Sequence, residues 1–274
     1  DDSVASIRQA YDQGVSDFIN RPFDAEVVHR RVFNTIKLYA KQRKLIALIT
    51  NQVYEKEKNN RILIEILSQI VEFRNGESGR HVLNVNILTG ILLEQLVQVT
   101  DKYNVSWSDR LMITTAASLH DIGKISVKDS ILLKPGKLTF DEFDQIKMHT
   151  TKGYEMLCRF TEVWGEEYAD AAKKICRWHH ERDDGRGYPD GLKGDQIPIE
   201  ALLVSIADVY DALTTKRVYK DAFEMDKAFN MVLDGECGEF SPKLLNCFCE
   251  VKGQFEDLAR EFKEAEVEVY TKGR

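Results

Sequence analysis

Doublets of histidine and aspartate are the residues of this 274-residue sequence whose types and spacing point most directly to chemistry. His120 is followed by Asp121, and His179 is followed by His180, although the chain has only six histidines. Each doublet lies at the border of an apolar segment that is typical of a buried helix. Imidazole and carboxylate groups bind iron, manganese and zinc, and mixed sets are more typical of catalytic than of closed structural sites. The two doublets therefore predict a metal centre.

Other carboxylates have the spacing or the surroundings of metal ligands. Glu77 and His81 are four residues apart, so on a helix they lie on the same face, although this spacing alone is common. Asp208 lies within an apolar helical run, where a carboxylate is costly to bury unless it is paired or bound to a metal. Asp211, almost one turn later, is placed to support either a metal ligand or a lysine.

The chain that must position these residues has mainly helical periodicity. Helical patterns extend roughly over 3–13, 25–60, 62–73, 80–100, 107–120, 139–148, 151–163, 166–181, 198–214 and 223–233, with a short strand pattern at 15–20. The loop from Asp183 to Ile197 differs from the rest, because four glycines and a proline interrupt it, and such loops are often functional. We therefore predict an all-α helical bundle with a functional glycine-rich loop.

Composition narrows the class of protein. With 43% hydrophobic and 30% charged residues, the chain has enough apolar material for a substantial core, which excludes a disordered or fibrous protein. A net charge of −7 argues against a surface for nucleic-acid polymers. No apolar run approaches the roughly 18 residues of a membrane span, and five cysteines without a signal-peptide pattern indicate reduced thiols. We expect a cytoplasmic protein with no membrane partner.

The motifs around the doublets resemble a known family. The run His120-Asp121-Ile122-Gly123-Lys124 is similar to the signature of the HD superfamily of metal-dependent phosphohydrolases. The stretch 179–182, followed by 187–194, resembles the hallmark of its HD-GYP branch. Matches at 129–138, 206–214 and 217–220 extend the resemblance, in order, over residues 62–250. The resemblance implies an HD-superfamily helical bundle that acts as a cyclic-dinucleotide phosphodiesterase.

The family resemblance also implies cofactors and their ligands. It implies two or three divalent ions, iron or manganese above others, bound by Glu77, His81, His120, Asp121, His149, His179, His180 and Asp208. Asp121 is expected to bridge two ions, and Glu77 matches the additional carboxylate of family members that hold three. His29 is outside this set and is expected at the surface.

The same resemblance implies roles in catalysis and substrate binding. Asp121 and Lys124 are expected to be catalytic, with Lys124 neutralising charge on the phosphoryl oxygens. The implied substrate-binding residues are Lys124, Gly187, Tyr188, Pro189, Arg217 and Lys220. The Gly-Tyr-Pro loop is expected to form a wall for a guanine base, and the last two cations of that set to hold phosphates.

The resemblance leaves the substrate open. Hydrolysis of cyclic di-GMP to linear 5′-pGpG, and onward to GMP, is the leading hypothesis. Asp183 stands where the family usually has tryptophan, so a preference for 3′,3′-cyclic GMP-AMP is an alternative. A non-catalytic cyclic-dinucleotide receptor is another, against which the complete ligand set counts. The Gly-Tyr-Pro loop disfavours a general HD nucleotidase.

The N-terminal residues resemble a different family. Residues 14–24 are similar to the last strand and the Lys-Pro turn of a response-regulator receiver domain, with Arg21 in the place of the lysine. This resemblance implies a truncated receiver remnant over 1–24, a long connecting helix over 25–61 and an HD-GYP domain over 62–274, all within a longer protein. The alternative for the N-terminal residues is a simple helical cap.

A seven-residue apolar repeat predicts that the connecting helix pairs with a second copy. The register contains Leu38, Leu45, Ile49, Leu63, Ile70 and Phe73. Polar residues interrupt it at Gln42, Gln52, Lys56 and Asn59. We therefore expect a homodimer whose helix pairing is loose in the middle.

Overall fold

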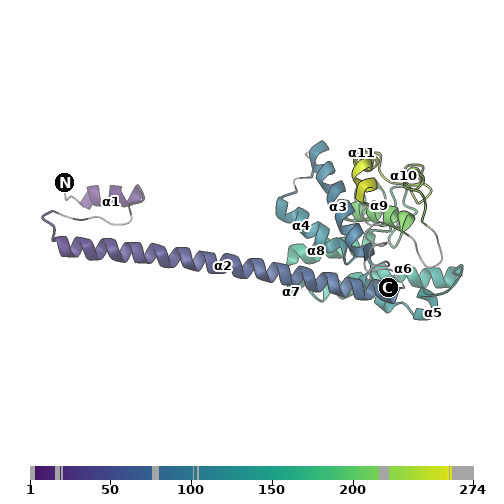
Figure 1. The fold of residues 1–274 in the computed structure, drawn as a ribbon, viewed down its shortest axis with the longest axis horizontal. Helices are drawn as coiled ribbons and strands as arrows, with labels where there is room; N and C mark the ends of the chain where they lie inside the picture. The colour runs from purple at the N-terminus through teal and green to yellow at the C-terminus, as the bar shows by residue number, and fades with distance from the viewer. Residues whose placement is uncertain are drawn as a thin grey trace, which may run out of the picture. The chain divides into compact units, whose positions relative to one another are not determined.

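Helices make up the regular structure of the described chain (Figure 1). The computed structural model describes residues 4–15, 19, 21–75, 80–100, 102–103, 105–215, 222–258 and 260. The helices are α1 (Val4–Asp12), α2 (Ala25–Arg74), α3 (Arg80–Val99), α4 (Trp107–Ala117), η1 (Ile122–Ser126), α5 (Asp129–Leu132), α6 (Phe140–Cys158), α7 (Thr161–Trp164), α8 (Glu166–Trp178), η2 (Gly194–Gln196), α9 (Ile199–Thr214), α10 (Met225–Leu233) and α11 (Pro242–Glu250), where η marks a 3₁₀ turn. The prediction of an all-α fold is confirmed for these residues, none of which lies in a strand.

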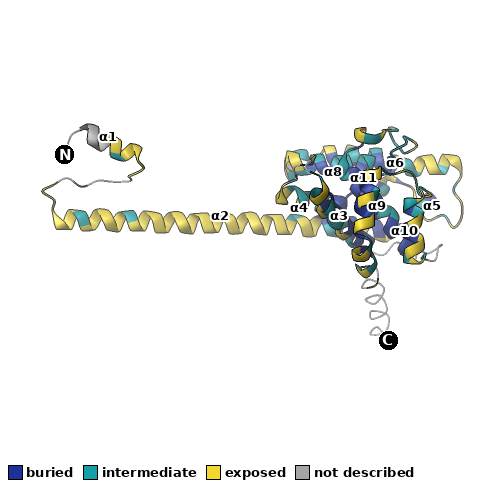
Figure 2. Cartoon of the chain, turned by 90° about the horizontal axis from the view of Figure 1, so that it is seen from above, coloured by how far each residue is buried: buried dark blue, intermediate teal, exposed yellow. Residues whose placement is uncertain are grey.

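The chain divides into two compact units, Asp1–Asn60 and Arg61–Arg274. The first contains α1 and the first part of α2, where apolar side chains are largely exposed (Figure 2). Only two residues of the strand expected over 15–20 are described, and neither is in a strand. α2 continues as one helix past residue 60, because the polar segment 54–61 contains no glycine or proline to end it.

The second unit has its core between α3, α4, α8 and α9. α9 is apolar on all sides, and its residues Ala201–Ala207 are all buried. α3 packs along α9 and also contacts α4 and α11, while α8 contacts α4, α6 and α9. The core helices thus place most of the possible metal ligands: His81 and Asp208 lie in α3 and α9, and the two doublets follow shortly after the ends of α4 and α8.

By length and composition, α3 is able to cross a membrane, which the sequence analysis did not anticipate. Its most apolar 18-residue window is 44% buried inside the molecule. The buried residues of α3 include the polar side chains of His81 and Asn84. α3 packs against α9, α4 and α11, as a helix of the core does.

α6 is a longer helix than the sequence pattern indicates. We predicted separate helices over 139–148 and 151–163, but one helix replaces most of both and the short α7 follows it. A capping box starts α6: the Thr139 hydroxyl accepts from the N–H of Glu142, whose carboxylate accepts from the N–H of Thr139. His149 therefore lies inside a continuous helix.

Two glycines allow the backbones of η1 and α6 to touch. A Cβ at Gly123 would overlap the carbonyl oxygen of His149, and a Cβ at Gly153 would overlap the sulfur of Cys176. No other residue type fits this spacing without moving the helices apart. The contact brings Asp121, two residues before Gly123, against α6.

Candidate metal centre

Histidine and carboxylate side chains from five parts of the chain meet in the second unit. They form two overlapping groups, within each of which one possible ligand atom per residue lies within 4.8 Å of the others. One group is His81, His120 and Asp121, and the other is Asp121, His149, His179 and His180. Asp208 of α9 lies beside the first group. The structure therefore brings together all the predicted ligands that it describes.

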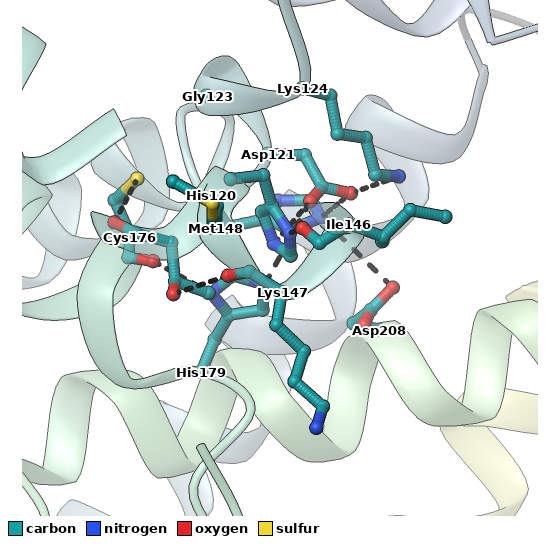
Figure 3. Close-up of polar contacts among 12 residues, drawn as sticks. His120, Asp121, Gly123, Lys124, Ile146, Lys147, Met148, Cys176, His179 and Asp208 are labelled. Carbon is teal, nitrogen blue, oxygen red and sulfur yellow. Dashed lines mark hydrogen bonds and ion pairs between the residues drawn. The ribbon is translucent and has the colours of Figure 1, made fainter. Parts of the chain in front are cut away.

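Asp121 belongs to both groups, and its two oxygens face different histidines (Figure 3). Oδ2 lies 3.2 Å from Nε2 of His120. Oδ1 lies 3.1 Å from Nε2 of His149 and 3.9 Å from Nε2 of His179. A carboxylate in this position is able to give one oxygen to each of two ions.

Main-chain carbonyls set the orientation of three of the imidazoles. Nδ1 of His120, His149 and His179 lies 2.8, 2.7 and 3.0 Å from the carbonyl oxygens of Ala117, Ile146 and Ile175, respectively. Because a carbonyl only accepts, each Nδ1 carries a proton, which leaves Nε2 as the nitrogen that is able to bind a metal. Histidines that bind metals are typically held in this way.

The Nε2 atoms of the cluster are buried without a hydrogen-bond partner among the described residues. This holds for His81, His120, His149 and His179, and also for Oδ1 of Asp121. Buried polar atoms are normally paired, because leaving one unpaired costs about 1–3 kcal/mol. Lone pairs on nitrogen and oxygen that converge on one place are the donor set of a divalent cation. The residues present therefore fit a divalent-metal site.

A carboxylate, not a carbonyl, orients His81. Its Nδ1 donates to Oδ2 of Asp211 at 2.7 Å, and Oδ1 of Asp211 accepts from Asn84 and Thr215. Of the two roles that the sequence left open for Asp211, the structure shows support of a candidate ligand. On the other side of the ring, Nε2 of His81 lies 3.4 Å from Asp208. Sequence reasoning missed Asn84, for which a polar residue in an apolar helix was the available signal.

Lys124 faces the same centre from η1. Its Nζ lies 2.5 Å from Oδ2 of Asp121 (Figure 3), and its side chain is 15% exposed. The ammonium group is therefore next to the shared carboxylate and still reachable from solvent.

Glu181 holds the glycine-rich loop against the cluster. Its carboxylate is fully buried and accepts from the three successive backbone N–H groups of residues 190–192. In the same loop the ring of Tyr188 stacks on His180, with 4.7 Å between centroids and 28° between planes. A Cβ at Gly187 would overlap the backbone of Glu181, so this tight path requires glycine. Sequence reasoning did not assign a role to Glu181, although it directly follows the histidine doublet.

A cavity of about 270 Å³ opens beside His180 and Tyr188, and Asp184 and Glu239 are among the residues that line it. Asp183 is the position at which the sequence departs from the family pattern, and a main-chain hydrogen bond holds it in place. Its N–H donates to the carbonyl of Glu239 at 2.9 Å.

We next compared the sequence with models of known protein families. The model described as HD domain matches residues 61–243. The chain belongs to the HD-domain family. An HD domain implies divalent-metal binding, in agreement with the donor set above.

Relatives of this HD domain have phosphodiesterase names. A probable cyclic di-GMP phosphodiesterase of Vibrio cholerae is 36% identical over 269 residues, which cover 93% of this chain and 60% of that protein. The cyclic di-GMP phosphodiesterase response regulator RpfG of Xanthomonas campestris is 35% identical over 274 residues, which cover 94% of this chain and 68% of that protein. Together with the motifs, these relatives support an HD-GYP domain. The chain spans only about 60% of the length of the first relative.

A solved structure shares the fold of the HD domain. The cyclic GMP-AMP-specific phosphodiesterase of Vibrio cholerae superposes with a TM-score of 0.52 at 14% identity, over 73% of this chain and 52% of that chain. At this identity the likeness shows the fold alone.

The surroundings of the histidines in the HD domain shift their pKa values in opposite directions. Burial disfavours the charged form of His81, but the neighbouring carboxylates of Asp208 and Asp211 outweigh it and raise the pKa well above its ordinary value. In the other group, burial and the neighbouring imidazoles lower the pKa of His179 to about 3 and that of His180 well below its usual range. These last two side chains are neutral, as metal ligands must be.

Two carboxylates of the candidate site, those of Asp121 and Asp208, have lowered pKa values. Burial opposes the charge on Asp121, but the ammonium of Lys124 and the adjacent His120 lower its pKa well below the ordinary value. Burial opposes the charge on Asp208 as well, but the adjacent His81 lowers its pKa well below the ordinary value.

The remaining predicted site residues have the following places. Glu77, Arg217 and Lys220 lie outside the described residues. Pro189 is half-buried next to Tyr188 in the loop. His29 is exposed on α2, as predicted.

Proposed function

We propose that the chain is a metal-dependent phosphodiesterase that hydrolyses cyclic di-GMP to linear 5′-pGpG and then, more slowly, to GMP. The observation that carries the proposal is the position of Asp121, which has one oxygen toward each of two histidine groups. Relatives that are named cyclic di-GMP phosphodiesterases support the same substrate.

The ligand set supports at least two ions. Asp121 would be shared between them, and Glu77 would add a carboxylate for a third. Iron or manganese is the proposed metal, because mixed sets of imidazole and carboxylate suit these ions. Bound ions would supply Lewis acidity at the phosphoryl group and lower the pKa of water from 15.7 toward about 7.

The chain's own residues would bind and orient the dinucleotide. Lys124, beside the shared carboxylate, is placed to neutralise charge that develops on the phosphoryl oxygens in the transition state. Tyr188, with Gly187 and Pro189, would form the wall for one base. Substrate phosphates that do not react would be held by Arg217 and Lys220, two cations that are three residues apart in the sequence.

Turnover of the purified, metal-loaded protein tests the proposal. Cyclic di-GMP, 3′,3′-cyclic GMP-AMP, linear pGpG, dGTP and cyclic AMP are each supplied, and the products are separated by chromatography. We expect cyclic di-GMP to be hydrolysed fastest and pGpG more slowly, because its free ends must be ordered. Faster hydrolysis of dGTP or cyclic AMP than of any cyclic dinucleotide would contradict the proposal.

The second candidate substrate is 3′,3′-cyclic GMP-AMP, which the unusual residue at Asp183 favours. Asp183 lies in the loop that carries Tyr188, and its main chain joins that loop to Glu239 and Gly194, so we expect a bulkier side chain at this position to alter the base wall. The ratio of kcat/KM for the two cyclic dinucleotides is compared between the wild type and Asp183→Trp. A shift toward cyclic di-GMP in the variant would support the mixed substrate for the wild type. Tight binding of either dinucleotide without turnover would support a receptor instead.

For the N-terminal part, we propose a receiver remnant over 1–24 and a connecting helix over 25–61, joined to the HD-GYP domain over 62–274 of a cytoplasmic response regulator. The resemblance of residues 14–24 to the end of a receiver domain supports this, and one relative is named a response regulator.

We also propose that α2 forms a homodimer. The residues of the apolar register, Leu38, Leu45, Ile49, Leu63, Ile70 and Phe73, are each more than half exposed. Apolar side chains at heptad spacing are covered when a second helix packs on them. Light scattering at micromolar concentration should give a dimer for the wild type and a monomer for the double variant Leu45→Glu, Ile49→Glu. A monomeric wild type would contradict the pairing.

A further inference from the structure

The last residue of α2 reaches the turn that carries Lys124. The guanidinium of Arg74 donates to three carbonyl oxygens of this turn: those of Lys124 at 3.1 Å, Ile125 at 3.0 Å and Val127 at 2.6 Å. It also pairs with the carboxylate of Asp129 at 2.6 Å. One side chain thus joins the end of α2 to both η1 and the start of α5.

The carbonyl contacts matter more than the ion pair. Asp129 is 65% exposed, so solvent screens its attraction to Arg74, and such pairs contribute little. A 3₁₀ turn of five residues, in contrast, has weak internal hydrogen bonds, and the carbonyl of Lys124 in this turn accepts from the N–H of Val127 as well as from Arg74. Arginine carries several donors in one rigid plane and is able to bind all of these carbonyls at once, whereas lysine is not.

We infer that Arg74 is a positioning residue for Lys124, holding the backbone of η1 so that the ammonium stays beside Asp121. The inference rests on the proposed function, in which Lys124 stabilises the reacting phosphoryl group. A lysine side chain is long and flexible, so its ammonium is placed only as well as its backbone is anchored. The base of Arg74 is itself fixed, because Val71 and Glu72 in the same helical turn are buried.

A double-mutant cycle tests whether Arg74 acts through Lys124. Arg74→Ala is expected to lower kcat by about tenfold with KM changed by less than about twofold, because the lost interaction matters in the transition state. In a Lys124→Ala background the same substitution should lower kcat by less than about twofold, since residues that act as a unit are not additive. Arg74→Lys should restore only part of kcat, and elemental analysis should find the bound metal unchanged in every variant.

Two controls and one independent measurement keep the result clear. Arg110→Ala removes an arginine whose side chain is similarly exposed but whose ion pair, with Glu94, joins α4 to α3 and not to η1. This variant should leave kcat unchanged. Asp129→Ala removes only the screened ion pair and should also have little effect. Hydrogen exchange of the amides in 121–129 should become faster in Arg74→Ala but not in Arg110→Ala.

Specific outcomes overturn the inference. An equal loss of kcat in the two backgrounds would show that Arg74 acts independently of Lys124, and an unchanged kcat or unchanged exchange over 121–129 would show that it does not hold the turn. A wild-type protein that hydrolyses no cyclic dinucleotide would instead refute the proposed function, and hydrogen exchange would still decide whether Arg74 anchors η1.

Discussion

The two histidine groups of the centre share one carboxylate but have different neighbours. The carboxylate-flanked group consists of His81, His120 and Asp208, and the imidazole-flanked group consists of His149, His179 and His180. In the first, His81 has a carboxylate on each side of its ring. In the second, the ring of His179 lies 5.5 Å from that of His149 and 4.0 Å from that of His180.

This difference in charge predicts unequal positions for two ions. An ion in the carboxylate-flanked group would be surrounded by more negative charge, which would bind it more strongly and leave it less electrophilic. Protons would compete with that ion, because the carboxylates raise the pKa of His81. An ion in the imidazole-flanked group would keep more of its positive charge, and protons would compete little with it, since the pKa of His179 is about 3.

Removal of the shared carboxylate should weaken metal binding in both histidine groups and have the largest effect on turnover. Asp121→Ala removes a donor from both groups, so we expect loss of bound metal and a fall in turnover of at least about 10³-fold. Elemental analysis after anaerobic preparation and turnover of cyclic di-GMP measure the two losses. Asp195→Ala, at an exposed surface pair with Lys102, is the matched control and should behave as the wild type. Retention of both ions in Asp121→Ala would show that the carboxylate is not shared.

The next largest effect should separate catalysis from metal binding. Lys124→Ala is expected to keep the metal and to lower turnover by about 10²–10³-fold, the cost of one lost electrostatic stabiliser. The exposed Lys128, in the same segment, provides the control variant Lys128→Ala. Turnover of Lys124→Ala at the wild-type rate would refute the role of this ammonium.

A change outside the ligand set should weaken only the carboxylate-flanked group. Asp211→Asn removes the charge that orients His81, and we expect metal affinity at that position to fall by about 10–100-fold. Titration with a chelator should then remove one ion early and the other at the wild-type concentration. Asp226→Asn, at a surface pair with Lys252, is the control. Equal weakening of both ions would show that the two groups do not act separately.

The smallest effect should come from the start of α6, the helix that carries His149 of the imidazole-flanked group. Hydrogen bonds from Lys134 and from the N–H of Thr139 lower the pKa of Glu142 below its ordinary value of 4.5. A lowered pKa means that the stabilisation is present above pH 4.5 and is lost as the pH falls through the folded-state value. Glu142→Gln should therefore lower Tm by a few degrees at pH 7, with the difference shrinking below about pH 4. A Tm difference that stays constant as the pH falls below 4.5 would contradict this explanation.

The sequence identifies the candidate ligands better than it identifies the residues that orient them. The doublets at His120 and His179 stand out because adjacent metal-binding side chains follow the ends of apolar helical segments. His149, a lone histidine in a polar helix, is assigned only through the family resemblance. The contact between His81 and Asp211 joins residues 130 positions apart, and local periodicity contains no information about such a pair.

The same distinction applies to the fold. Helical periodicity predicts most of the helices, because apolar faces recur where the core is. It does not predict that α6 is a single helix, since the break expected near His149 is removed by close packing on Gly123, a contact between separate segments. The reach of Arg74 to the carbonyls of η1 is likewise a property of packing, about 50 positions away along the chain.

The hydrogen bonds that Nδ1 of His120, His149 and His179 donates to main-chain carbonyls have a consequence for metal loading. The backbone orients these rings, so their orientation does not require an ion. We therefore expect folding and metal loading to be separate events, unlike in small domains that fold around their metal. Because the affinity of such nitrogen and oxygen donors for different divalent ions follows a general chemical order, the ion installed reflects which metals the cell supplies when the finished protein is loaded.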